Sequence, residues 1–128
     1  MEFIAEIGWN FMGNMKLAEE MIFSAKNAGA TTVKFQYWSP SKLKPGDWDH
    51  DGRREIYERA QLTQQKISEL QSYTKKAGLE FLISVFNAAD AKIMTDLKIT
   101  EIKIPSHEIT NVELHKFCIQ NFKKIYNF

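Results

Sequence analysis

Strand-like apolar runs separated by helical patterns are the feature of this 128-residue chain that most restricts its fold. Such runs occupy residues 3–8, 31–38, 79–86 and 100–105, and another begins within 122–128. Near-continuous apolar runs are typical of strands buried on both faces of a parallel sheet. When such strands alternate with helices, they predict an α/β fold in which right-handed crossovers join parallel neighbours.

Four helices are predicted between these strands. The first carries an apolar stripe at helical spacing that stops before Gly29. Thr63, Asn87 and Asn111 each precede one of the other three, and their side chains suit the N-cap position. The predicted order is therefore strand and helix four times, followed by the start of a fifth strand.

The length of the chain limits how much of such a fold it holds. A (β/α)8 barrel typically needs about 250 residues, roughly twice this length. We therefore expect a TIM (β/α)8-type barrel of which residues 1–128 form one incomplete domain, with the first four βα units and the start of strand five. The polar connection 39–54 contains Pro and Gly and has the length typical of a lid or binding loop.

The composition argues against several functional classes. Basic residues number 17 and acidic residues 16, and a net charge of +1 gives no support for a nucleic-acid or membrane surface. No apolar run approaches the ~20 residues that span a bilayer. Cys118 is the single cysteine, so no internal disulfide forms, which fits a reducing compartment. We expect a cytoplasmic protein.

Polar residues interrupt the apolar runs near the carboxyl end of each strand, where α/β barrels and open sheets bind their ligands. These residues are Glu6, Asn10, Lys34, Gln36, Ser84, Lys103, Ser106, His107 and Glu108. Two lysines and two hydroxyls suit a phosphate or carboxylate, and two glutamates suit sugar hydroxyls, proton transfer or a metal. Structural ion pairs, Lys34 with Glu6 or Lys103 with Glu108, are the alternative interpretation.

Five segments carry a family resemblance. They are "IAEIGWNFMGN", "AKNAGATTVKFQ", "YERAQLT", "AGLEFLISVF" and "IKIPSHEITN". In this order, over nearly all of the chain, they resemble the motifs of the sialic acid synthase (N-acetylneuraminate synthase) family. The chain departs from that pattern at Phe11, where the family usually has His, at Val85, where it has Pro, and at His107, where it has a small residue.

The resemblance implies a TIM barrel, followed in full-length members by a small antifreeze-like domain. The C-terminal half of the barrel and that domain are expected to be absent from residues 1–128. The implied reaction condenses phosphoenolpyruvate (PEP) with an N-acylhexosamine such as N-acetylmannosamine. It yields phosphate and a nine-carbon 2-keto-3-deoxy sugar acid of the sialic, legionaminic or pseudaminic type. Full-length relatives pair, so a homodimer, or a complementing second half, is the implied partner.

The resemblance also assigns roles to residues. PEP would be bound by Lys34, Ser84, Lys103 and Ser106, the sugar by Asn10 and Gln36, and catalysis would fall to Glu6 and Glu108. A divalent metal, manganese or magnesium, is implied as cofactor. Its two histidine ligands are expected beyond residue 128, since His50, His107 and His115 do not match those positions.

Residues 47–58, "DWDHDGRREIYE", fit the calcium-loop pattern D-x-D-x-D-G-x5-E. Asp47, Asp49, Asp51 and Glu58 would be the ligands. The preceding Pro-Gly pair breaks an incoming helix, and the sequence contains no second such loop. The alternative is therefore a solvated lid loop near the mouth of the barrel.

Two other functions remain open from the sequence. Lys34 or Lys103 could serve a Schiff-base aldolase, because a lysine desolvated in a barrel is a suitable amine nucleophile. The chain could also be inactive, or one half of a split enzyme, and only bind a phosphorylated ligand. A half-barrel exposes two sheet edges and is expected to associate with itself or with a partner.

Overall fold

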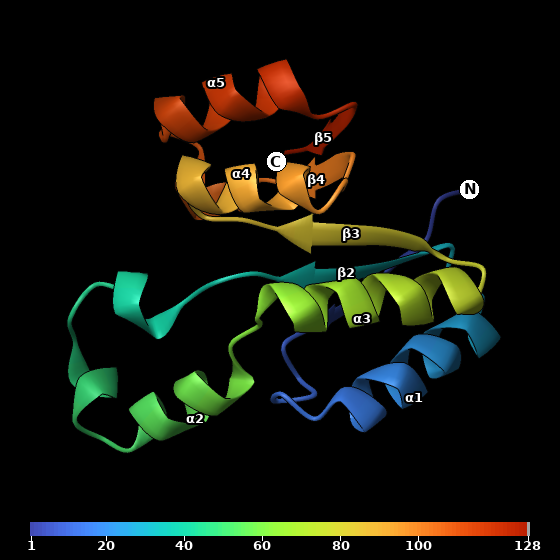
Figure 1. Cartoon of the computed structure of the whole chain (residues 1–128), viewed down its shortest axis with the longest axis horizontal. Coiled ribbons are helices and arrows are strands. Elements are labelled where there is room, and N and C mark those ends of the chain that lie inside the picture. The colour runs from blue at the N-terminus through green and yellow to red at the C-terminus, as the bar shows by residue number, and fades with distance from the viewer. Residues whose placement is uncertain (128) are drawn as a thin grey trace.

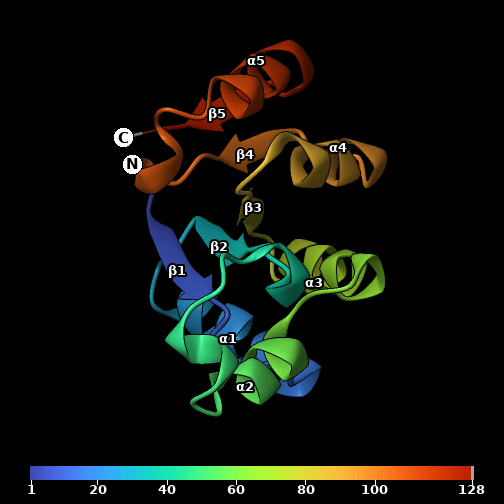
Figure 2. The ribbon, with the colours of Figure 1, turned by 90° about the vertical axis from the view of Figure 1, so that its left-hand side faces the viewer.

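Five parallel strands form one sheet in the order β1-β2-β3-β4-β5 in the computed structural model, which describes residues 1–127. The strands are β1 (Ile4–Gly8), β2 (Thr32–Gln36), β3 (Glu80–Ser84), β4 (Glu101–Lys103) and β5 (Lys124–Tyr126). Each predicted strand is present, although shorter than its apolar run, and Phe128 lies outside the described residues. Figure 2 shows the strands following one another along an arc, as in part of a barrel.

Five α-helices and three short 3₁₀ segments connect the strands (Figure 1). The helices are α1 (Met15–Asn27), α2 (Arg53–Ala60), α3 (Gln64–Lys76), α4 (Ala88–Asp96) and α5 (Val112–Asn121). The 3₁₀ segments are η1 (Pro40–Lys42), η2 (Asp47–Asp49) and η3 (Ser106–Glu108). The side chains of Thr63, Asn87 and Asn111 each accept a hydrogen bond from a backbone N–H in the first turn, which confirms the three predicted N-caps.

The sequence predicts four helices, and the structure contains a further one, α2. It begins inside the connection 39–54, where an irregular loop is expected, and continues into the segment before α3. Only Ala60 of its eight residues is buried. Ile56, Tyr57 and Ala60 are its only apolar side chains, too few for periodicity to reveal the helix.

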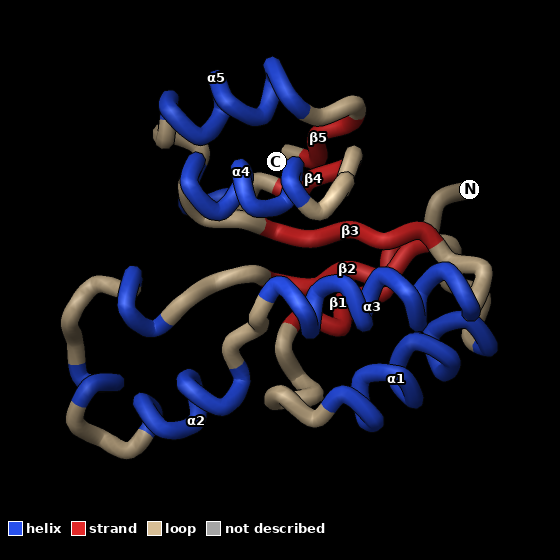
Figure 3. Tube along the Cα trace, in the orientation of Figure 1, coloured by secondary structure: helices blue, strands red, loops and turns tan. Residues whose placement is uncertain are grey.

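The helices form two contacting pairs along the outside of the sheet. Helix α1 packs on α3 beside β1 and β3, and α4 packs on α5. Figure 3 shows α2 at one end of the molecule, connected by a short loop to α3. No helix within residues 1–127 combines the length and apolar character that a membrane span requires.

The strands present different chemistry on their two faces. Val33, Phe35, Ile83 and Ile102 are fully buried in the core that the helices cover. The alternate residues, among them Glu6, Lys34 and Lys103, instead line a cavity on the inner face of the sheet. Because side chains alternate along a strand, the polar interruptions fall on one face and leave the core apolar.

The two ends of the curved sheet are connected through the N-terminal segment. The Glu2 carboxylate accepts hydrogen bonds from the Lys124 ammonium at 3.1 Å and from the Tyr126 hydroxyl. These bonds lower the pKa of Glu2, the Tyr126 bond most. The residues that precede β1 therefore contact β5.

Candidate functional site

The strand register brings polar side chains together at the carboxyl end of the sheet. Glu6 is paired with Lys34 across β1 and β2, and Ser84 is paired with Lys103 across β3 and β4. A cavity of about 350 Å³ lies over these strand ends. Its lining consists of Glu6, Lys34, Gln36, Ser84, Phe86, Lys103, Pro105, Ser106 and His107. We call it the anion cavity because two ammonium groups face it.

The structure therefore brings six of the eight predicted site residues to one cavity. Glu108 and Asn10 do not line it. Glu108 accepts a hydrogen bond from the Asn111 side chain at 2.9 Å and lies beside a neighbouring cavity. The exposed Asn10 side chain donates to the carbonyl of Ile7 at 2.8 Å, within its own turn.

Lys34 lies at the centre of the polar contacts. Its ammonium is ion-paired with the Glu6 carboxylate and donates to the Ser84 hydroxyl at 3.3 Å. The Lys34 side chain is 14% exposed and the Glu6 side chain 48%. The predicted ion pair is thus present, and it leaves the carboxylate open to solvent at the cavity mouth while the ammonium lies deeper.

Lys103 is the more deeply buried cation, at 6% exposure. Its ammonium donates to the carbonyl of Ile104 at 2.8 Å. Burial lowers the pKa of Lys103, the nearby charge of Lys34 lowers it further, and Glu6 opposes both. Two neighbouring lysines inside one concave surface create a positive potential that attracts a small anion.

A glycine shapes the strand end next to Glu6. Gly8 has φ +60° and follows a register irregularity between Glu6 and Gly8. A Cβ at this position would lie 3.2 Å from a Glu6 carboxylate oxygen. Only glycine adopts this backbone freely, so Gly8 allows the chain to turn close over the Glu6 carboxylate.

Phe11, one of the departures from the family pattern, belongs to the core. It is 1% exposed and packs edge-to-face on Phe35, with ring centroids 6.0 Å apart. A buried aromatic pair of this kind stabilises the fold. Phe11 therefore anchors the loop after β1 and does not contribute a polar group to the site.

Residues 1–127 contain no group of three His, Cys, Asp or Glu side chains arranged to hold a metal ion. Three of the four carboxylates of the calcium-loop pattern face arginines instead. Asp49 is ion-paired with Arg54, Glu58 lies 3.5 Å from Arg54, and Asp51 lies 2.6 Å from Arg53. The two ammonium groups of the anion cavity likewise disfavour a divalent cation. The resemblance places the ligands of the manganese or magnesium beyond residue 128, so that cofactor stays a prediction.

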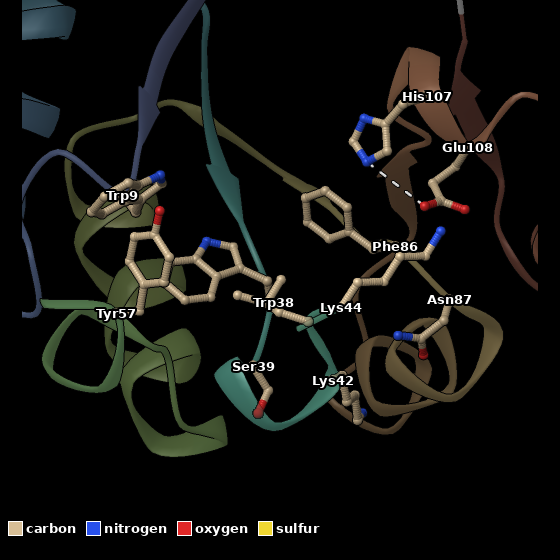
Figure 4. Close-up of a pocket in the computed structure, with 11 residues that line it drawn as sticks. Trp9, Trp38, Ser39, Lys42, Lys44, Tyr57, Phe86, Asn87, His107 and Glu108 are labelled. Atoms are coloured by element: carbon tan, nitrogen blue, oxygen red, sulfur yellow. Dashed lines mark ion pairs between the residues drawn. The ribbon is translucent and has the colours of Figure 1, made fainter. Parts of the chain in front are cut away.

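A second cavity, of about 570 Å³, adjoins the anion cavity, and we call it the aromatic cavity (Figure 4). Trp9, Trp38 and Tyr57 line it, with ring centroids 5.4–5.8 Å apart in edge-to-face contacts. Phe86 and His107 stack at 5.5 Å and line both cavities. No motif in the sequence indicates these aromatic residues, although Trp9 and Trp38 follow the carboxyl ends of β1 and β2, where ligand-binding residues are expected.

An ion pair between a buried carboxylate and a half-exposed lysine fixes one wall of the aromatic cavity. Asp90, at the start of α4, is 1% exposed, pairs with Lys42 of η1 and accepts from the Asn87 side chain at 2.9 Å. Lys42 and Asn87 also line the cavity. This contact ties the connection after β2 to α4, and nothing in the sequence pattern indicated it.

Comparison with known proteins supports the resemblance. The model of the NeuB family matches residues 21–126. The N,N'-diacetyllegionaminic acid synthase of Campylobacter jejuni is 31% identical over 95% of this chain and 40% of its own. The synthase of the same name from Legionella pneumophila is 29% identical over 90% of this chain and 35% of its own. The pseudaminic acid synthase of Helicobacter pylori is 26% identical over 95% of this chain and 39% of its own. The chain thus spans less than half the length of these relatives.

Solved structures agree with the fold. A putative spore coat polysaccharide biosynthesis protein E from Chromobacterium violaceum superposes with a TM-score of 0.82 at 20% identity, over 98% of this chain and 40% of its own. The spore coat polysaccharide biosynthesis protein spsE of Bacillus subtilis superposes with a TM-score of 0.77 at 26% identity, over 98% of this chain and 35% of its own. At 20% identity, the likeness to the Chromobacterium violaceum protein shows the fold alone. Because the family model matches most of the chain, the protein belongs to the NeuB family, the sialic acid synthases.

Proposed function

We propose that the protein forms the PEP-binding part of a sugar-acid synthase, in which its five strands begin a (β/α)8 barrel. The enzyme condenses PEP with an N-acylhexosamine, such as N-acetylmannosamine, and makes a nine-carbon 2-keto-3-deoxy acid of the sialic, legionaminic or pseudaminic type. One observation carries the proposal: Lys34, Ser84 and Lys103, from three adjacent strands, line one cavity at the carboxyl edge of the sheet. The names of the relatives support this class of product.

The anion cavity suits PEP by charge and by hydrogen bonding. PEP carries a phosphate and a carboxylate, and Lys34 and Lys103 offer one ammonium each. Ser84 and Ser106 add hydroxyl donors to the same lining. Strands held by a sheet ladder place these groups before the ligand arrives, which reduces the ordering that binding requires.

Glu6 is the residue of this cavity best suited to proton transfer. In the condensation, C3 of PEP attacks the aldehyde carbon, a water adds at C2, and phosphate leaves from the tetrahedral intermediate. The water loses a proton as it adds. The half-exposed Glu6 carboxylate, held beside Lys34, accepts that proton in this proposal. The expected metal has no ligand set within residues 1–127, and no step is assigned to it.

Binding and turnover test the proposal separately. Calorimetric titration of PEP into the chain should show binding that inorganic phosphate competes with and that Lys34→Met weakens at least tenfold. Lys116→Met, at an exposed position of α5, is the matched control and should bind as wild type does. Absence of PEP binding by the wild-type chain would contradict the proposal.

Turnover requires the remaining strands, which the longer relatives possess. With the complementary part of a relative's barrel supplied, phosphate release from PEP should depend on added N-acetylmannosamine and on manganese. Release without the sugar would indicate simple hydrolysis. No release from an assembly that binds both substrates would overturn the synthase assignment while leaving the PEP site in place.

A Schiff-base aldolase is the second candidate, and the buried Lys103 favours it. Burial lowers the pKa of Lys103, and a neutral amine is the nucleophile in such enzymes. Borohydride reduction in the presence of a carbonyl substrate separates the two candidates. A covalent adduct at Lys103 would support the aldolase, whereas an unmodified lysine would support the synthase.

A further inference from the structure

His107 lines the anion cavity but has no role in the proposed binding of PEP. It follows β4 in the segment η3, and its side chain is 63% exposed. It is also a position at which the chain departs from the family pattern. Histidine is the side chain whose charge most readily changes between about pH 5 and 8. The protonation state of this imidazole therefore decides how many cations the cavity presents to an anion.

The His107 ring is held in place by its neighbours. It stacks on Phe86 with ring centroids 5.5 Å apart and ring planes 29° from parallel. The backbone N–H of Glu108 donates to the carbonyl of Pro105 at 2.9 Å, which closes the turn that carries the ring. Figure 4 shows the imidazole beside Phe86 and Glu108. The ring is thus a fixed part of the cavity wall before any ligand binds, which reduces the ordering that binding requires.

The Glu108 carboxylate lies beside one edge of the imidazole. One of its oxygens is 3.7 Å from His107 Nε2, and the other accepts from the Asn111 side chain at 2.9 Å. A protonated imidazole donates through both ring nitrogens, whereas a neutral one donates through a single nitrogen. Protonation therefore allows the ring to pair with Glu108 through Nε2 and to donate to an anion through Nδ1.

The charge of the anion cavity depends strongly on this one side chain. Lys34 and Lys103 supply two positive charges to the lining and Glu6 supplies one negative charge, so together they give a formal charge of +1. Protonation of His107 raises the formal charge of the lining to +2. A dianion such as a phosphate group is matched by the second value and only half matched by the first.

We propose that protonated His107 is a third cationic ligand of the anion in the anion cavity, so that affinity for a dianion rises as pH falls. The inference rests on the proposed function, because it takes this cavity as the site of PEP. Hydrogen bonds from charged donors are roughly twice as strong as neutral ones, and for a half-exposed donor we expect a gain of about tenfold in affinity. With a neutral imidazole, the anion is held by the two lysines and the serine hydroxyls alone.

Calorimetric titration with sulfate tests the inference, because sulfate stays a dianion throughout this pH range whereas the phosphate of PEP titrates. Wild type should bind sulfate about tenfold more tightly than His107→Gln at about pH 5.5, and the two should bind alike at about pH 8. His107→Arg carries a permanent charge and should exceed His107→Gln about tenfold at both pH values. The other charged groups around the ring are common to these proteins, so their titration cancels; they are Glu6, Lys34, Lys42, Lys44, Lys103 and Glu108.

His115→Gln is the matched control. The His115 ring lies 3.3 Å from the carbonyl oxygen of Glu108 but lines neither cavity, so this variant should bind sulfate as wild type does at both pH values. If wild type binds PEP but exceeds His107→Gln with sulfate at neither pH, or if His107→Arg gains nothing at about pH 8, the inference is overturned and the proposed function stands. Failure of wild type to bind PEP overturns the proposed function and this inference with it.

Discussion

The two adjoining cavities are built in different ways. The anion cavity draws Lys34, Ser84 and Lys103 from adjacent strands whose positions are fixed by ladder hydrogen bonds. The aromatic cavity draws Trp9, Trp38 and Tyr57 from segments outside the strands, and these are fixed by contacts between rings and by an ion pair. Backbone register places the first set, and side-chain contacts place the second.

This difference has consequences for mutation. A substitution in the anion cavity removes a ligand contact but leaves the ladder intact, so it should change binding more than stability. A substitution around the aromatic cavity removes part of what holds the connecting segments, so it should change stability and binding together. Variants at the two cavities can confirm or break this distinction.

The largest effect is expected from Gly13→Ala. The substitution places a side chain at φ +80° and a Cβ against the carbonyl oxygen of Arg59. Left-handed backbone and overpacking each cost about 1–3 kcal/mol, so we expect a loss of about 3 kcal/mol or more in the free energy of unfolding. Urea unfolding measures this loss, and displacement of α2 should also change the tryptophan fluorescence.

Gly29→Ala is the control for that variant. Gly29 has φ +91°, but a Cβ at this position would meet nothing within 4 Å beyond its own neighbours in the chain. Only the cost of left-handed backbone applies there, about 1–2 kcal/mol. If Gly13→Ala cost no more than Gly29→Ala, the contact between Gly13 and Arg59 would not be what holds α2.

Lys103→Met should affect binding most among the anion-cavity variants. It removes a 6%-exposed cation that lines the anion cavity, and we expect the affinity for PEP to fall about 100-fold, or about 2.7 kcal/mol. The free energy of unfolding should not fall, because methionine needs no desolvation of a charge. Calorimetry and urea unfolding on the same samples test both parts. A variant that unfolds more easily would show that Lys103 stabilises the sheet.

Lys42→Met should show the opposite behaviour. It leaves the buried carboxylate of Asp90 without its cation, although Asn87 still donates to it. Lys42 is 44% exposed, so solvent screens the pair and the expected loss is about 1–2 kcal/mol. Lys92→Met is the control, because it removes an exposed pair with Asp96 on the same helix and should cost less than about 0.5 kcal/mol. Equal losses in urea unfolding would show that the Lys42–Asp90 pair does not hold the connection.

A smaller effect follows from the lowered pKa of Lys103. Between that pKa and the ordinary value of about 10.4, the unfolded chain binds more protons at this lysine than the native chain does. The stability of the wild type relative to Lys103→Met should therefore rise as pH increases through this window. At lower pH the cost of burying the charged lysine should be fully present. Urea midpoints of both proteins, from neutral pH to about pH 10.5, measure the difference in stability between them. The contributions of the other titrating groups cancel in this difference because both proteins contain them. A difference independent of pH would contradict the lowered pKa.

The anion cavity could be predicted from the sequence because parallel strands align their carboxyl ends. Lys34, Ser84 and Lys103 each lie near the end of an apolar run, so strand order alone brings them together. The N-caps at Thr63, Asn87 and Asn111 could be predicted for a similar reason. In each, the side chain accepts a hydrogen bond from the backbone N–H only three positions later. Features that arise from a strand and its immediate ends are visible in sequence.

The aromatic cavity could not be predicted because its contacts join residues that no periodicity connects. Lys42 and Asp90 are 48 positions apart, and neither lies in an apolar stripe facing the other. Helix α2 was missed for a related reason, as it buries only Ala60. Asn10 is bonded within its own turn, to the carbonyl of Ile7, and its predicted contact with the sugar stays a prediction.

The smallest effect is expected from calcium, and it concerns the motif at residues 47–58. Because Arg54 pairs with Asp49 and lies over the Trp48 ring at 5.1 Å, a bound calcium ion would have to displace it. Displacement would alter the fluorescence of Trp48. We expect millimolar calcium to leave both the fluorescence and the urea midpoint unchanged. Arg54→Gln sharpens the test, since it frees Asp49 and Glu58 together. If that variant acquires a calcium response and wild type has none, the arginine is what keeps a calcium-like sequence from acting as a calcium site.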